Sequence, residues 1–159
     1  MTAETKYNLG QYYFGILGLF VIGFGILELL FFFTGGEYTY GILNIPPAIV
    51  RSTVIASMGV FMVAGASKLK SIDGLALVTL ACIMLWIFAA NDMFEVATAS
   101  ILPAEDEEPE EGTVWVNTWE GFLETWKGPY YPCVILLPFT LPIFLYIRNY
   151  REDLRVFEY

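Results

Sequence analysis

The sequence predicts an all-α integral membrane protein, with four transmembrane helices in an up-down bundle and a short interfacial amphipathic helix before the fourth. The chain of 159 residues is 57% hydrophobic and 16% charged, whereas a soluble domain is about 45–50% apolar and about 25% charged. Residues 74–91 also form a long run without a charged side chain. Such a run indicates a membrane span, because only a helix satisfies its own backbone hydrogen bonds in lipid. A chain of this length makes a single domain, residues 1–159.

The first helix is predicted over residues 11–33, after a short polar tail at residues 1–10. Three glycines fall within one sector of its helical wheel, and Glu28 lies near that sector. Glycines allow another helix to approach closely, which is how helices associate in lipid. We therefore expect this sector to pack against a neighbouring helix. The three glycines are Gly15, Gly18 and Gly25.

The second and third helices are predicted over residues 48–67 and 74–96. A turn-rich loop at residues 34–47 precedes the second helix. That helix carries a row of small residues at four-three spacing, and such rows line helix contacts in membranes. Asp73 is expected to cap the third helix. The row of small residues includes Ser52, Ala56 and Gly59.

An acidic loop at residues 97–128 follows the third helix. Six of the ten residues in 103–112 are carboxylates, which indicates a solvated linker or, alternatively, a segment at 105–111 that docks a basic partner. Aromatic residues then repeat at intervals of four, three and four. This spacing predicts an interfacial helix that anchors the loop to the membrane, or a face that binds a partner. These aromatic residues are Trp115, Trp119, Phe122 and Trp126.

The fourth helix is predicted over residues 129–147, followed by a helical tail. It contains Pro132, Pro138 and Pro142. Proline has no backbone N–H and breaks the hydrogen-bond ladder of a helix. We therefore expect a kink, with the freed carbonyls bonded to neighbouring helices or to water.

The distribution of basic residues predicts that both termini are cytoplasmic. In this orientation six of the eight Lys and Arg residues lie inside, and the acidic loop is extracytoplasmic. The positive-inside rule favours this arrangement, in a plasma-type membrane. The acidity of the outer side argues against a nucleic-acid partner. The inner basic residues are Lys6, Lys68, Lys70, Arg148, Arg151 and Arg155.

This orientation brings five polar residues to the outer third of the membrane: Glu28, Arg51, Asn91, Asp92 and Glu95. Ionisable groups in a membrane are costly, so they tend to face inward and pair. The planar guanidinium of Arg51 suits two carboxylates, Glu28 and Asp92. Three interpretations remain open: an ion cluster that holds three helices in register, a polar cavity that binds a cation, a proton or a lipid headgroup, or groups that simply reach the interface.

The composition argues against catalysis. The chain has no histidine, which removes the commonest ligand for haem, copper and zinc and the usual general base. Cys82 and Cys133 are expected at different depths, so no disulfide is expected between them. No nucleotide-binding, hydrolase or zinc motif occurs. We predict no enzymatic activity, no metal and no cofactor, and we expect bound lipids.

Four spans with glycine seams, and an arginine (Arg51) that opens the second helix, resemble the small DoxX-like membrane proteins. This resemblance concerns architecture, so no functional residue is carried over from that family.

Two functions are expected from these features. The first is a non-catalytic accessory or structural subunit of a larger membrane protein complex, which packs on other integral membrane subunits and on lipids through its glycine seams and aromatic surfaces. The alternative is a small transporter, or a lipid- or quinone-binding protein, that uses the outer polar cluster.

Overall fold

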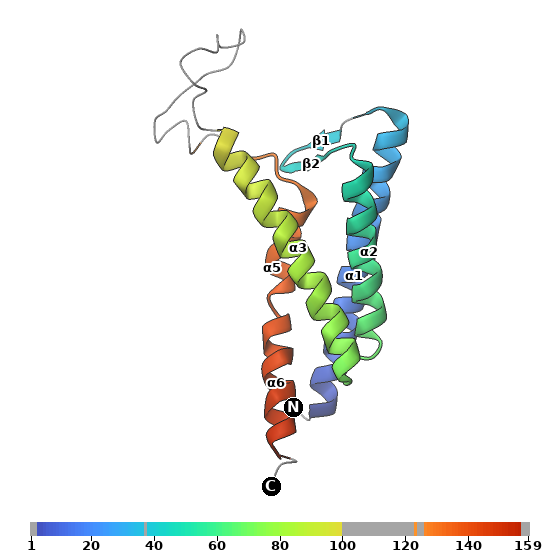
Figure 1. Cartoon of the computed structure of the whole chain (residues 1–159), viewed down its shortest axis with the longest axis vertical. Helices are drawn as coiled ribbons and strands as arrows, with labels where there is room; N and C mark the ends of the chain where they lie inside the picture. Colours follow the sequence, from blue (N-terminus) through green and yellow to red (C-terminus); the bar gives the residue numbers. More distant parts are fainter. Residues whose placement is uncertain (1–2, 37, 100–122, 124–125, 157–159) are drawn as a thin grey trace.

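The computed structural model describes residues 3–36, 38–99, 123 and 126–156. Within this part of the chain, four stretches are long and apolar enough to cross a membrane, as predicted. These stretches are Tyr7–Thr34, Ile49–Ala66, Ile72–Thr98 and Pro132–Arg151. The elements are α1 (Ala3–Thr34), β1 (Tyr38–Tyr40), β2 (Leu43–Ile45), α2 (Ile49–Ala66), α3 (Ile72–Ala99), α5 (Pro132–Thr140) and α6 (Ile143–Val156) (Figure 1).

α1, α2 and α3 lie side by side and alternate in direction, and α5 and α6 follow each other back toward the end at which α1 starts (Figure 1). α1 packs along α2, α2 along α3, and α3 against α5 and α6. Both chain termini lie at one end of the molecule, together with the turn between α2 and α3. The strands β1 and β2 lie at the opposite end, here called the hairpin end.

Glycines and other small residues form the contact between α1 and α2. A Cβ atom on Gly25 would lie 2.7 Å from the backbone nitrogen of Ala56 and 2.9 Å from the carbonyl oxygen of Ser52. A Cβ atom on Gly59 would lie 2.7 Å from the carbonyl oxygen of Gly18. These distances are too short for real atoms, so only glycine lets the two backbones approach this closely.

Gly15 lies outside this contact, unlike the other two glycines of its predicted sector. A Cβ atom on Gly15 would meet no atom within 4 Å. An α-helix has 3.6 residues per turn, so Gly15 is rotated by about 60° from Gly18. This rotation turns Gly15 away from α2.

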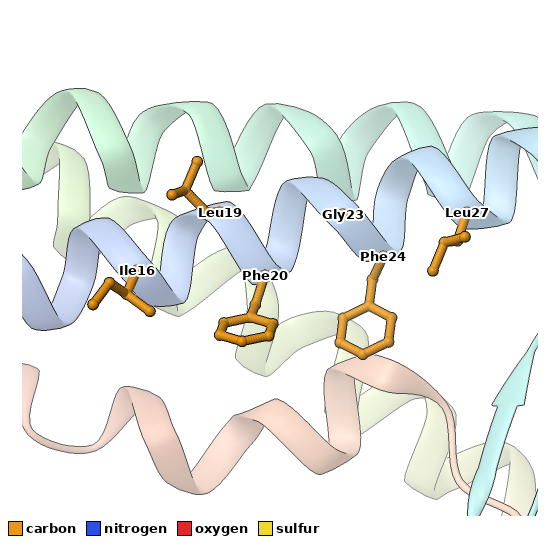
Figure 2. Close-up of a pocket in the computed structure, with 6 residues that line it drawn as sticks. All are labelled: Ile16, Leu19, Phe20, Gly23, Phe24 and Leu27. Atoms are coloured by element: carbon orange, nitrogen blue, oxygen red, sulfur yellow. The ribbon is translucent and has the colours of Figure 1, made fainter.

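A shallow apolar groove runs along α1 on the side toward α5 (Figure 2). Its volume is about 380 Å³, and Phe20 and Phe24 point from it toward α5. A second groove of about 380 Å³, between α1 and α5, shares Ile16 and Phe20 with the first. α1 therefore has apolar space beside α5, in contrast to its close contact with α2. The first groove is lined by Ile16, Leu19, Phe20, Gly23, Phe24 and Leu27.

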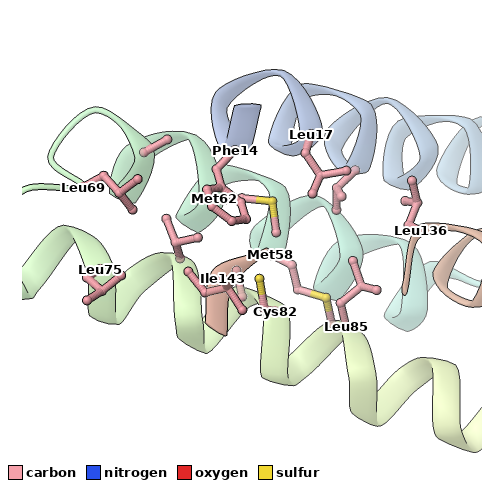
Figure 3. Close-up of a cluster of buried hydrophobic side chains, with 14 of the residues drawn as sticks. Phe14, Leu17, Met58, Met62, Leu69, Leu75, Cys82, Leu85, Leu136 and Ile143 are labelled. Carbon is pink, nitrogen blue, oxygen red and sulfur yellow. The ribbon is translucent and has the colours of Figure 1, made fainter. Parts of the chain in front are cut away.

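The interior between the helices is apolar (Figure 3). Phe14 of α1, Met58 and Met62 of α2, Leu85 of α3 and Ile143 of α6 are all fully buried in one cluster. The cluster joins helices from both halves of the chain, and it lies between the terminal end and the polar residues described below.

Two helix starts differ from the predictions. α1 begins at Ala3 and not near residue 11. Tyr7, within the predicted polar tail, packs on α6, with its ring centred 6.3 Å from that of Tyr146. At the start of α3, the N–H of Gly74 donates to the hydroxyl of Ser71 at 3.1 Å. α3 starts at Ile72, so Ser71 and not Asp73 occupies the capping position.

The predicted loop at residues 34–47 contains a β-hairpin. β1 and β2 pair antiparallel, with Tyr38 opposite Ile45 and Tyr40 opposite Leu43. Gly41 in the turn has a φ of 58°, which glycine adopts without steric cost. Strands of three residues are too short to show an alternating pattern in the sequence, so the hairpin was not predicted.

The predicted fourth helix is divided into α5 and α6 by a break after Thr140. Pro142 has no N–H for the carbonyl of Pro138, which instead accepts from the N–H of Leu141 at 3.4 Å. The hydroxyl of Tyr13 in α1 donates to the carbonyl of Phe139 at 2.7 Å. The expected kink is thus a full break, and a neighbouring helix bonds a carbonyl beside it.

A side chain of α3 donates a second hydrogen bond at the break between α5 and α6. The indole N–H of Trp86 donates to the hydroxyl of Thr140 at 2.6 Å. The same indole stacks on Phe144 in the first turn of α6, with ring centroids 5.1 Å apart. α1 and α3 therefore both hold the junction of α5 and α6.

Most of the acidic loop lies outside the described residues. This applies to the segment 105–111 and to three of the four aromatic residues predicted in the interfacial helix. The fourth, Trp126, is a half-buried residue in a turn before α5. The three aromatic residues outside the described part of the chain are Trp115, Trp119 and Phe122.

Candidate functional site

A buried ion pair joins α2 to α3 near the hairpin end. The two terminal nitrogens of Arg51 bind the two carboxylate oxygens of Asp92 at 2.5 and 2.7 Å. Asp92 is fully buried and the Arg51 side chain is only 14% exposed. Two parallel bonds of this kind form the strongest arrangement between arginine and a carboxylate. Arg51 lies in the first turn of α2, so the pair connects the beginning of α2 with the C-terminal half of α3.

Glu28 of α1 completes the charged group but is bound differently. Its oxygen Oε1 lies 3.4 Å from Nε of Arg51, and its side chain is fully buried. Neither carboxyl oxygen of Glu28 has a hydrogen-bond partner among the described residues, and the same holds for Nε of Arg51. Buried polar atoms are nearly always hydrogen-bonded, so Glu28 is the exceptional member of the group.

The chain just before α5 and the start of α5 close the group on a further side. The guanidinium carbon of Arg51 lies 4.5 Å from the centre of the Tyr131 ring, a cation–π contact. Cys133, at the second position of α5, is buried with its thiol within electrostatic range of Arg51, Glu28 and Asp92. Residues from α1, α2, α3 and α5 therefore converge at this site, here called the Arg51 cluster (Glu28, Arg51, Asp92, Tyr131 and Cys133).

The hairpin is tied to the chain segment that carries Tyr131. The N–H of Asn44 donates to the carbonyl of Tyr130 at 2.9 Å, and the N–H of Tyr130 donates to the carbonyl of Ile42 at 2.7 Å. Ile45 of β2 is 2% exposed, and β2 contacts both α1 and α5. The hairpin and the segment before α5 thus link α1 to α5 at the same end of the molecule as the Arg51 cluster.

Two of the five residues predicted in the polar cluster lie outside it. Asn91 and Glu95 are exposed on α3, whereas Asp92 faces Arg51. A helix turns by about 100° per residue, so Asn91 and Glu95 are rotated away from Asp92 in the same direction, by about 100° and about 60°. Only one of the three polar positions can point directly at α2.

Sequence reasoning did not include Tyr131 or Cys133 in the site. The available signal was their position, because both lie at the start of the predicted fourth helix and therefore at the same end as Arg51. Their contact with Arg51 depends on the rotation of α5, which the apolar pattern of that segment does not specify.

Cys82 and Cys133 are both free and buried. Within the ranges that the structure describes, no group of three or more Cys, Asp or Glu side chains is arranged to hold a metal ion. The charged side chains of the Arg51 cluster pair with one another, Arg51 with Asp92 through two bonds and with Glu28 at 3.4 Å.

No protein-family model, no curated protein and no solved structure matches this chain. These comparisons therefore do not support the likeness to DoxX-like proteins.

Proposed function

We propose that this protein is a non-catalytic accessory or structural subunit of a larger membrane protein complex. The observation that supports this role is the exposed apolar face of α1. Ile16, Leu19 and Phe20 are 55%, 61% and 60% exposed along the groove of about 380 Å³ (Figure 2). A transmembrane helix of another subunit is the occupant that we propose for this groove.

The glycines of α1 favour a helix as the occupant. Gly18 and Gly25 are used inside the chain, where α2 approaches them closely. Gly23 lies in the groove, and a Cβ atom there would meet no atom within 4 Å. Close approach at small residues drives helix association in lipid, where apolar surface alone gives little preference for a helix over a lipid tail. α1 thus carries a glycine that permits close helix approach on its exposed side as well as on the side toward α2.

The orientation is part of the proposal. We infer an integral membrane protein with both termini cytoplasmic and the acidic loop on the extracytoplasmic side of a plasma-type membrane. The common location of the two termini in Figure 1 agrees with an even number of crossings. Lys68 and Lys70 lie in the turn at that end, and Arg148 and Arg151 lie in the last part of α6, as the positive-inside rule requires of the cytoplasmic side.

A small transporter or a lipid- or quinone-binding protein is the second candidate. The buried and poorly bonded Glu28 favours transport. The groove between α1 and α5, lined by apolar side chains and closed at one position by the Tyr13 bond to Phe139, favours an elongated apolar ligand. This candidate requires no partner protein.

Purification in mild detergent, followed by native mass measurement, separates the two candidates. A subunit is expected to travel in a stoichiometric complex, and Gly23→Leu is expected to release it because the new side chain fills the groove. Ala64→Leu is the matched control, since Ala64 is exposed on α2 away from the groove. A wild-type protein that purifies alone would contradict the subunit role and leave the second candidate.

A further inference from the structure

The Arg51 cluster contains two carboxyl groups and one guanidinium. Arg51 directs both terminal nitrogens to Asp92, so these two residues form a closed, neutral pair. Only Nε of Arg51 remains for Glu28, at 3.4 Å and without hydrogen-bond geometry. Glu28 is thus a carboxyl group without a counter-charge of its own.

The surroundings of Glu28 stabilise a negative charge poorly, because among the described residues Arg51 approaches it with Nε alone, at 3.4 Å. The side chain is fully buried, and neither of its oxygens accepts a hydrogen bond from a described residue. An ionised carboxylate in such a place loses its hydration without replacement, which costs far more than burial of the neutral acid. The nearby ionisable groups are Arg51, Asp92 and Cys133, and Arg51, the only cation among these three, is already bound by Asp92.

A bound metal cation is a poorer solution than a proton. A cation at Glu28 would lie next to the positive guanidinium of Arg51, which repels it. Cations such as sodium or calcium also need several oxygen ligands, and no group of three acidic or thiol side chains is placed for a metal in the described part of the chain. A proton needs only the one carboxyl oxygen that does not face Arg51.

We propose that Glu28 is a proton-binding site, which holds its proton for as long as Asp92 holds Arg51. The two carboxyl groups then share one proton and one guanidinium. When Arg51 moves to Glu28, the proton leaves Glu28, Arg51 pairs with the resulting carboxylate, and Asp92 is the group that takes a proton. Charge and protons balance in this exchange, and the number of buried charges stays the same.

The site is independent of the proposed subunit role. It requires neither a partner helix nor the groove along α1, and it would give the second candidate a specific ligand, the proton. Release of the protein from a complex therefore says nothing about Glu28, and the test of Glu28 says nothing about a complex.

Infrared spectroscopy of the purified protein at neutral pH tests the proposal directly, because a neutral carboxyl group has a C=O band separate from that of carboxylates. The wild-type protein is expected to show such a band, and selective ¹³C labelling of glutamate is expected to shift it. Glu28→Gln should abolish the band. Glu95→Gln, the same change at an exposed glutamate of α3, should leave it unchanged.

A second variant tests the exchange with Asp92. In Asp92→Asn, Glu28 is the one carboxyl group left next to Arg51 among the described residues. It should therefore ionise, and the band should disappear although Glu28 is present. If Glu28→Gln does not fold, the ¹³C shift in the wild-type protein still shows whether a glutamic acid side chain is neutral. Absence of a glutamic acid band at neutral pH overturns the proposal, and so does a carboxylate band at this site that responds to added sodium.

Discussion

Glu28, Arg51 and Asp92 should behave as one coupled unit when their charges are removed in turn. Asp92→Asn keeps the size of the side chain but removes the charge that Arg51 binds through two nitrogens, at 2.5 and 2.7 Å. Removal of one partner from a buried ion pair costs about 3–5 kcal/mol of unfolding free energy. Glu28 lies 3.4 Å from Arg51 and can ionise to replace Asp92, so we expect a smaller loss of about 1.5–3 kcal/mol, the range of a hydrogen bond to a charged group.

Glu28→Gln should have a small effect by itself. Glutamine has the shape of a neutral glutamic acid, and Glu28 has no hydrogen bond to any described residue that the substitution could remove. We expect a change of less than about 1 kcal/mol, the net value of an ordinary hydrogen bond. The double variant leaves Arg51 without a carboxylate and should lose about 3–5 kcal/mol, which is more than the two single losses added together.

Reversible unfolding in mixed detergent micelles, followed by circular dichroism, measures the four free energies of this cycle. Glu95→Gln is the matched control and should leave the stability unchanged, because Glu95 is exposed. If the loss of the double variant equals the sum of the two single losses within ~0.3–0.5 kcal/mol, as for independent sites, Glu28 does not replace Asp92. A Glu28→Gln variant as unstable as Asp92→Asn would show that Glu28 is ionised and an equal partner of Arg51.

Two further predictions concern the helix contacts. Gly25→Ala should destabilise the protein by about 1–3 kcal/mol, the cost of overpacking, because the new Cβ would lie 2.7 Å from the backbone of α2. Gly15→Ala should instead stabilise it by roughly 0.5–1 kcal/mol, because the Cβ meets no atom within 4 Å and alanine is the better helix former. Equal effects of the two variants in the same unfolding assay would contradict the α1–α2 contact. Tyr13→Phe should leave the carbonyl of Phe139 without its partner, at a cost of about 1–3 kcal/mol, and should speed hydrogen exchange at the junction of α5 and α6. Tyr12→Phe, at a side chain 74% exposed, is its control, and unchanged exchange in Tyr13→Phe would show that the bond does not support the junction.

The sequence by itself determined the number of long helices and the level of the charged residues along them. An apolar run such as residues 74–91 has few alternatives to a helix, because backbone groups in an apolar medium must bond within their own segment. Glu28, Arg51 and Asp92 were expected at one level, since this depends only on counting residues from the helix ends. The sequence also indicated Gly18, Gly25 and Gly59 as helix-packing positions, because small residues recur at helical spacing on both segments.

The tertiary structure decided how each helix is rotated and what the ends of the helices touch. Position along the chain predicted contacts for Gly15, Asn91 and Glu95. In the structure Gly15 is rotated by about 60° from Gly18, and Asn91 and Glu95 are rotated by about 100° and 60° from Asp92, so all three lie outside those contacts. An apolar surface all round a helix carries no signal for this rotation. The approach of Tyr131 to Arg51 likewise follows from the packing of segments eighty residues apart, and such long-range contacts leave no local pattern in the sequence.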